Sequence, residues 1–189
     1  MSHSSLYGIN KDFYGEEIAV YKNSWWFSPI VWSVLIEKYM YHKFSMFRNN
    51  TGWEILNTKL NNSEIPCDRV LWELSNQQIF KSSDKEFVFE CIEKFLLKND
   101  KYDVNDNVPI LKREHIQDRF REIADDIKNN DYEYFVFKNT SVDDAVENWF
   151  WDYEHDKKIP LNNPKAEFVI IKDGDIRDFI LAEEIMNRG

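Results

Sequence analysis

Residues 167–181 read EFVIIKDGDIRDFIL, two short runs of β-forming residues on either side of a tight-turn signal. The first run, Glu167–Lys172, is rich in Val and Ile, and the second, Ile176–Leu181, contains Ile, Phe and Leu. Because Asp173-Gly174-Asp175 favours a tight turn, the two runs are predicted to pair as a β-hairpin. The C-terminal end of the chain is therefore expected to supply two strands of a sheet.

A third strand and a helix are predicted immediately upstream of this hairpin. Residues 132–138 read YEYFVFK, and tyrosine, phenylalanine and valine favour strands. Thr140 or Ser141 is placed to cap a helix from about Val142 to Tyr153. The resulting order of strand, helix, strand and strand is a β-α-β-β unit, which predicts a small sheet.

The N-terminal two-thirds of the chain has mainly helical periodicity. Ser28 followed by Pro29 is typical of a helix start, and Ser83 followed by Glu86 has the order of a capping box. Residues 13–21 fit a strand and a short helix equally well. Helices are predicted over residues 29–43, 68–80, 84–98 and 113–129, with a further short helix after Gly52.

These patterns predict one α+β domain over residues 1–189. Its N-terminal two-thirds is expected to be helical, and its C-terminal β-α-β-β unit is expected to form a small sheet covered by helices. Residues 13–21 are a candidate for one more strand. The polar segment 99–109 is expected to be the most mobile internal loop, and a boundary between sub-lobes would fall there.

Charge is the strongest compositional signal. The chain carries 34 acidic and 24 basic residues, for a formal net charge of −10. A field of this sign repels phosphate backbones, so we expect no direct binding of nucleic acid. It speeds encounter with a basic protein, so a basic protein partner is favoured. The alternative is that the charge serves solubility alone.

Cysteine usage and the start of the chain favour a cytoplasmic protein. The two cysteines, Cys67 and Cys91, are too few for a disulfide framework and are expected to be reduced. The first residues show neither a basic nor an apolar signal region. The longest apolar stretch, residues 25–40, is interrupted by Ser, Pro, Glu and Lys, so we expect no membrane span.

Motifs for common chemistries are missing from the sequence. The five glycines are scattered, which excludes Walker and Rossmann phosphate loops, and no nucleophile-elbow motif occurs. The four histidines are not paired at ligand spacing. His155, among carboxylates, could help to ligate a metal, but a solvated helix end is the favoured interpretation. We therefore expect no cofactor, no metal and no enzymatic activity.

One constellation stands out between Asp143 and Asp156, where six acidic residues and no Lys or Arg alternate with aromatic residues. On a helix, Trp151 would project to the solvent side, because the opposite face carries the other apolar residues. A large apolar side chain in an acidic field is typical of an interface anchor. The alternative is that Trp151 packs against the Lys157-Lys158 loop. The predicted binding interface consists of Trp151, Asp144, Glu147, Asn148 and Asp152, and the predicted core-facing residues are Val142, Val146, Trp149, Phe150 and Tyr153.

The segment YKNSW at residues 21–25 resembles part of an immunity protein, the class encoded beside polymorphic or contact-dependent bacterial toxins. The resemblance covers five residues and carries no site residue. It implies a protein that occludes the active site of a cognate toxin, often a basic nuclease. Two alternatives stay open: a phage or mobile-element inhibitor that mimics nucleic-acid charge, and a small hydrolase that uses scattered carboxylates. A pocket with converging carboxylates would favour the hydrolase.

Overall fold

The computed structural model describes residues 3–22, 27–40, 50–105, 107–140 and 149–188. The strands are β1 (His3–Ile9), β2 (Gly15–Lys22), β3 (Ile79–Lys81), β4 (Val104–Asn105), β5 (Val108–Pro109), β6 (Tyr134–Thr140), β7 (Trp151–Asp152), β8 (Lys157–Lys158), β9 (Glu167–Lys172) and β10 (Asp175–Leu181). The helices are α1 (Ser28–Met40), α2 (Asn50–Asn61), α3 (Pro66–Ser75), α4 (Lys85–Lys98), α5 (Glu114–Asn129) and α6 (Ala182–Met186), with short 3-10 turns at Ser82–Asp84 and Ile110–Lys112. The α+β class is confirmed.

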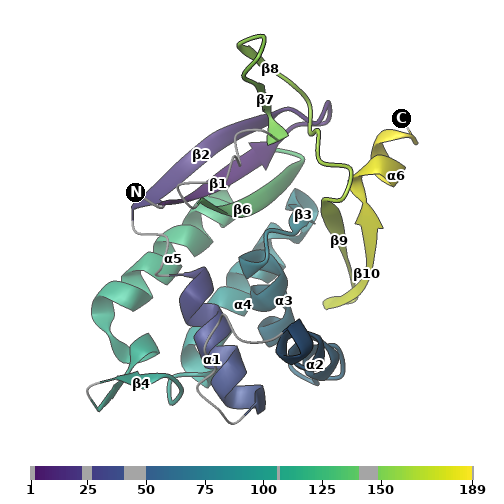
Figure 1. Ribbon diagram of the computed structural model, residues 1–189. Helices are drawn as coiled ribbons and strands as arrows, with labels where there is room; N and C mark the ends of the chain where they lie inside the picture. Colours follow the sequence, from purple (N-terminus) through teal and green to yellow (C-terminus); the bar gives the residue numbers. More distant parts are fainter. Residues whose placement is uncertain (1–2, 23–26, 41–49, 106, 141–148, 189) are drawn as a thin grey trace.

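The main sheet has six strands in the order β10-β9-β3-β6-β1-β2. The pairing is antiparallel except between β3 and β9, which run parallel. The two chain ends therefore lie at opposite edges of the sheet, and strands from the middle of the sequence lie at its centre (Figure 1).

Alternate residues of the strands face two separate apolar clusters, as the period of two in a strand requires. Phe135 and Phe137 of β6 pack into the larger cluster, together with the apolar faces of α1, α3, α4 and α5. Tyr134 and Val136 of the same strand face a smaller cluster on the other side of the sheet. That second face is covered by the segment that follows residue 149 and by α6, so both faces of the sheet are buried against other elements.

The sheet is larger than the C-terminal unit predicted from sequence. Residues 13–21, which fitted two structures, lie mostly in β2, and β1 is a strand that sequence reasoning missed. The helix predicted over residues 68–80 ends at Ser75, where Gln77 takes a positive φ of 64° and Ile79 enters β3. The N-terminal two-thirds is therefore not helical alone: β1, β2 and β3 join the main sheet, and β4 and β5 form a separate two-stranded sheet.

Two local predictions are wrong. The helix predicted to end at Tyr153 does not continue through residues 150–153, since Trp151 and Asp152 form β7; Trp149 has 3-10 geometry, and the preceding residues 141–148 lie outside the described part. The capping box at Ser83 is not formed, because α4 starts at Lys85 and its N-cap residue, Asp84, makes no side-chain capping bond.

The polar segment 99–109 is held at its beginning. Asn99 is fully buried and donates a hydrogen bond from Nδ2 to Oδ1 of Asp68 over 3.0 Å. Helices α4 and α5, which flank the segment, share one core cluster, where the rings of Phe95 and Phe120 stack with centroids 6.3 Å apart. The mobility of the rest of this loop and the sub-lobe boundary stay predictions.

Candidate functional site

A short hairpin, β7–β8, rises from the edge of the sheet (Figure 1). In this hairpin Trp151 pairs with Lys158 and Asp152 pairs with Lys157. The carboxylate of Asp152 accepts backbone hydrogen bonds from Glu154 over 3.1 Å and from His155 over 3.2 Å. It also bonds Nδ1 of His155 over 2.8 Å, and this contact lowers the pKa of Asp152. Asp152 therefore organises the hairpin turn.

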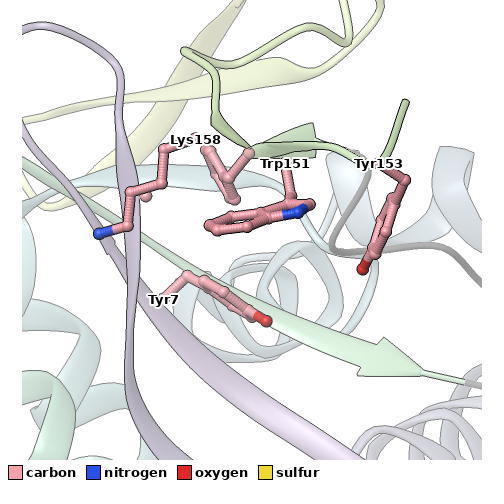
Figure 2. Close-up of a pocket in the computed structure, with 6 residues that line it drawn as sticks. Tyr7, Trp151, Tyr153 and Lys158 are labelled. Atoms are coloured by element: carbon pink, nitrogen blue, oxygen red, sulfur yellow. The ribbon is translucent and has the colours of Figure 1, made fainter. Parts of the chain in front are cut away.

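Below the hairpin lies a pocket of about 270 Å³, which we call the aromatic pocket. Figure 2 shows the indole of Trp151 across from the ring of Tyr7, with Tyr153 and Lys158 on either side. The rings of Tyr7 and Phe150 stack with centroids 5.6 Å apart, and both side chains are buried. The lining residues are Tyr7, Gly15, Phe150, Trp151, Tyr153 and Lys158.

The chain after residue 149 is fixed to the sheet by backbone hydrogen bonds. The carbonyl of Phe150 accepts from Ile159 over 2.9 Å, and that of Trp149 accepts from Asn162 over 3.1 Å. Leu161 donates to the carbonyl of Phe13 over 2.9 Å. These long-range partners occupy the carbonyls that a helix would pair with amides four residues later. Tertiary contacts thus explain why residues 150–153 do not form an α-helix.

Gly15 makes room for the floor of the pocket. A Cβ at this position would come within 2.6 Å of the ring of Phe150, a separation that side chains cannot adopt without a shift of the ring or the strand. The start of β2 therefore packs directly beneath Phe150 because it has no side chain there.

Among the described residues that line the aromatic pocket, the charged one is Lys158, and it is paired with Glu16. Glu16 accepts hydrogen bonds from the hydroxyl of Tyr132 over 2.7 Å and from Nζ of Lys158 over 3.0 Å. These two contacts, that of Tyr132 first, lower the pKa of Glu16. Lys158 is therefore already paired within the protein. The turn between β7 and β8 adds two exposed carboxylates, those of Glu154 and Asp156, next to the pocket-lining residue Tyr153.

A cation–π contact already exists beside the pocket. Nζ of Lys138, a buried residue of β6, lies 3.2 Å from the centroid of the Trp149 ring. An ammonium group held against an indole face is stabilised by the ring quadrupole. The protein therefore already contains a cation–π contact at Trp149, the residue that precedes Phe150 of the pocket wall.

The predicted interface residues divide into two groups. Trp151 is half-buried and faces the aromatic pocket, so its predicted position on the outer face of a helix is wrong. Its pairing with Lys158 agrees with the alternative that it packs against the lysine pair. Asp152 lies beside it. Asp144, Glu147 and Asn148 lie outside the described residues, as do the predicted core positions Val142 and Val146.

The predicted core positions after residue 148 are right in part. Phe150 is buried and Trp149 is half-buried, but the side chain of Tyr153 is 58% exposed at the pocket mouth. Sequence reasoning missed Tyr7 and Gly15, which β1 and β2, paired antiparallel, bring to the aromatic residues. No local pattern in the sequence signals these contacts.

A second hollow, of about 330 Å³, lies between α2, α3 and the β9–β10 hairpin. We call it the polar hollow. Two carboxyl groups line it, those of Glu73 and Glu167. Burial raises the pKa of Glu73 to about 7, with a smaller raising effect from Glu167 and an opposing effect from Arg69. The two hollows share no lining residue.

The cysteines occupy the predicted helical, apolar settings. Cys67 of α3 and Cys91 of α4 are buried and carry no disulfide. The thiol of Cys91 donates a hydrogen bond to Cys67, which lowers the pKa of Cys67 to about 7 and raises that of Cys91. Their reduced state in the cell stays a prediction.

Within the described ranges, no three His, Cys, Asp or Glu side chains gather as metal ligands would, and the absence of a metal stays a prediction. His155 contacts a single carboxylate, that of Asp152. In the same part of the chain, the helices are all too short or too polar to cross a bilayer.

Comparison with protein-family models, curated proteins and solved structures found no match for this chain.

Proposed function

We propose that this chain is a binding protein whose aromatic pocket takes a Lys or Arg side chain of a basic protein partner. The main support for this proposal is the pocket itself. The side chains of Tyr7, Phe150, Trp151 and Tyr153 line one cavity of about 270 Å³. Aromatic faces attract a cation through their quadrupoles, by about 0.5–2 kcal/mol per contact.

The carboxylates of the adjacent β7–β8 turn support this choice of partner. Negative charge there favours the approach of a cation and disfavours that of a phosphate. Because Lys158 is bonded to Glu16, the carboxylates of Glu154 and Asp156, both exposed, stay available to a partner. The formal net charge of −10 acts in the same direction over a longer range.

Trp151 and Tyr153 are suited to be the anchors of such an interface. Both offer a large ring that loses little conformational freedom on binding, and aromatic residues are enriched among interface hot spots. The floor beneath them is rigid, since Tyr7 and Phe150 are buried and stacked. A preformed pocket reduces the ordering cost of association.

Within this class, we propose an immunity protein that acts in the cytoplasm and occludes the active site of a cognate toxin. The resemblance at residues 21–25 and the acidic character of the chain support this choice. A phage-encoded inhibitor of a defence nuclease would use the same pocket against a different partner. The gene beside this one distinguishes the two, as a toxin gene favours the first and phage structural genes favour the second.

The pocket is tested with a pair of peptides that differ only in charge. An arginine-containing peptide should bind the wild-type chain in calorimetry, and the same peptide with citrulline at that position should bind at least about tenfold more weakly. Trp151→Ala and Tyr153→Ala should each reduce binding of the arginine peptide. Leu97→Ala, at a position of α4 that is 74% exposed, should leave it unchanged. Equal binding of both peptides would disprove cation recognition.

The immunity function is tested by co-expression with the product of the adjacent gene. The wild-type chain should restore growth of cells that express a toxic product, and Trp151→Ala should restore it poorly while melting at nearly the same temperature. Full protection by a Trp151→Ala and Tyr153→Ala double variant would show that the aromatic pocket is not the inhibitory surface.

A further inference from the structure

The polar hollow is built from three kinds of side chain. Trp53 of α2 and Trp72 of α3 contact each other, with ring centroids 5.1 Å apart, and Phe179 of β10 forms the third aromatic wall. The carboxyl groups of Glu73 and Glu167 also line it. The remaining lining groups are the amides of Asn57, Asn61, Asn76 and Gln78.

Glu73 is the most informative of these residues. It is only 7% exposed, and the hollow is the space that its side chain lines. Among the described residues, no hydrogen bond to its carboxyl group occurs, although a buried carboxyl group normally has a partner. Arg69, one turn earlier on α3, donates a hydrogen bond from Nη1 to the carbonyl of Ile176 over 3.2 Å. It donates none to Glu73. The carboxyl group of Glu73 therefore accepts no hydrogen bond from a described residue and opens into the hollow, where a ligand can reach it.

The amides around Glu73 are held in place by the protein. Oδ1 of Asn57 accepts a hydrogen bond from Nε1 of Trp72 over 2.6 Å. Nδ2 of Asn76 donates to the backbone carbonyl of Trp72 over 2.8 Å. Each amide therefore keeps its other polar atom for a ligand, Nδ2 on Asn57 and Oδ1 on Asn76. The hollow thus offers both donors and acceptors beside aromatic faces.

We propose that the polar hollow binds a neutral saccharide. A sugar ring has an apolar face of C–H groups, which packs against an aromatic ring, and hydroxyl groups that both donate and accept hydrogen bonds. Amides and carboxyl groups match the hydroxyls in both roles. The volume of about 330 Å³ lies at the small end of the range for small-molecule sites, which begins at about 300 Å³.

The charges of the hollow favour a neutral ligand over an anionic one. Neither Lys, Arg nor His is among the described residues that line it, whereas two carboxyl groups are. An anionic sugar would meet the carboxyl groups of Glu167 and Glu73, whereas the nearby cation, Arg69, does not line the hollow and already acts on Glu73 and on the ring of Phe179. Because the pKa of Glu73 is about 7, its carboxyl group is partly protonated at neutral pH and can donate as well as accept.

The test is a titration with glucose, cellobiose, maltose and N,N′-diacetylchitobiose, followed by saturation-transfer NMR and calorimetry. Glucuronate serves as the anionic counterpart of glucose. At least one neutral sugar should bind with a Kd of about 1 mM or tighter, and glucuronate should bind at least about tenfold more weakly than glucose. No binding of any neutral sugar at about 10 mM, or equal binding of glucuronate and glucose, would overturn the proposal.

Two variants test whether the sugar binds in the polar hollow. Trp53→Ala removes a half-buried aromatic wall, and Asn61→Ala removes an exposed amide with no consequence for the core. Each should weaken the sugar by about fivefold or more. Trp151→Ala is the matched control, since it removes an indole from the other pocket and should leave sugar binding unchanged. If Asn61→Ala binds like wild type, or if Trp151→Ala loses the sugar, the assignment to this hollow is wrong. The arginine-peptide assay is independent of these outcomes because the hollows share no residue.

Discussion

At the scale of single residues, Gly15 shows how the absence of a side chain shapes the aromatic pocket. The ring of Phe150 occupies the space beside the Cα of Gly15, and a Cβ at this position would lie only 2.6 Å from that ring. We expect Gly15→Ala to lower the free energy of unfolding by roughly 1–3 kcal/mol, the usual cost of overpacking. Urea denaturation gives this value directly.

A double-mutant cycle identifies the cause of that loss. In a Phe150→Leu background the ring is absent, so adding Gly15→Ala should cost less than it does in the wild-type chain. Equal costs in the two backgrounds would mean that the strain at Gly15 comes from a different neighbour.

Glu73 couples stability to pH. Its pKa of about 7 in the folded state lies above the ordinary 4.5 because of burial. The folded protein therefore holds this proton more tightly than the unfolded chain. Stability from this group is highest below about pH 4.5 and falls as the pH rises to about 7, by roughly 3 kcal/mol in total.

Glu73→Gln removes the titrating group, so we expect the variant to lack this part of the pH dependence. Above about pH 7 it should be more stable than wild type, by at most roughly 3 kcal/mol. The check is urea denaturation of both proteins at about pH 5 and about pH 8, with Glu64→Gln on an exposed loop as control. Parallel pH curves for Glu73→Gln and wild type would contradict this coupling.

At the scale of elements, one buried network joins α1, α3 and the end of α4. Asp68, 1% exposed, accepts hydrogen bonds from Nζ of Lys38 over 2.5 Å, from the hydroxyl of Tyr39 over 2.7 Å and from Nδ2 of Asn99 over 3.0 Å. Lys38 also donates to Oδ1 of Asn99 over 2.7 Å. Removal of Asp68 would leave the Lys38 ammonium without its counter-charge and Nδ2 of Asn99 without its acceptor, while Lys38 keeps Asn99 and Tyr39 keeps Ser63 as partners.

We expect Asp68→Ala to destabilise the protein by about 3–5 kcal/mol, since it leaves the Lys38 ammonium largely buried without its counter-charge. Asp100→Ala is the control. Its ion pair with Lys112, 3.3 Å long, joins two side chains that are about half exposed, so its loss should cost less than about 1 kcal/mol. Thermal melting of the two variants compares them. Similar melting temperatures would show that the buried network contributes little.

At the scale of the whole molecule, the sheet joins the two ends of the sequence into one unit. Strands β1 and β2 come from the N-terminus, β9 and β10 from the C-terminus, and β3 with β6 lies between them. We expect a single cooperative unfolding transition, in which far-ultraviolet circular dichroism and tryptophan fluorescence change together. Two separated transitions would instead support a boundary within residues 99–109.

The sequence predicted what local patterns encode. The stripes of α4 and α5 and the hairpin at residues 167–181 were recognisable because period and turn chemistry are local properties. The short strand β3 was read as part of a helix, because three residues that pair with β6 and β9 carry no pattern of their own. Strand β1 has seven residues, HSSLYGI, but it is buried along almost its whole length and shows no alternation of polar and apolar residues.

The candidate sites depended more strongly on tertiary structure. Trp151 was recognised by its acidic surroundings, but its direction was wrong, because pairing with Lys158 determines it and a helical projection does not. In the sequence, nothing distinguishes Glu73 from the other carboxylates. Its burial and its place in the polar hollow are visible only in the structure. Partners from distant strands, such as Tyr7, could be found only from the sheet register.

The order of strands also has a consequence for synthesis on the ribosome. One edge of β1 pairs with β2, which is synthesised directly after it. The other edge pairs with β6, which is synthesised only after α1 to α5. During this interval the nascent chain exposes an unpaired strand edge, the kind of surface on which other chains add strands. The helices made in between must therefore shield that edge, or a chaperone must, until Tyr134–Thr140 leaves the exit tunnel and closes the sheet.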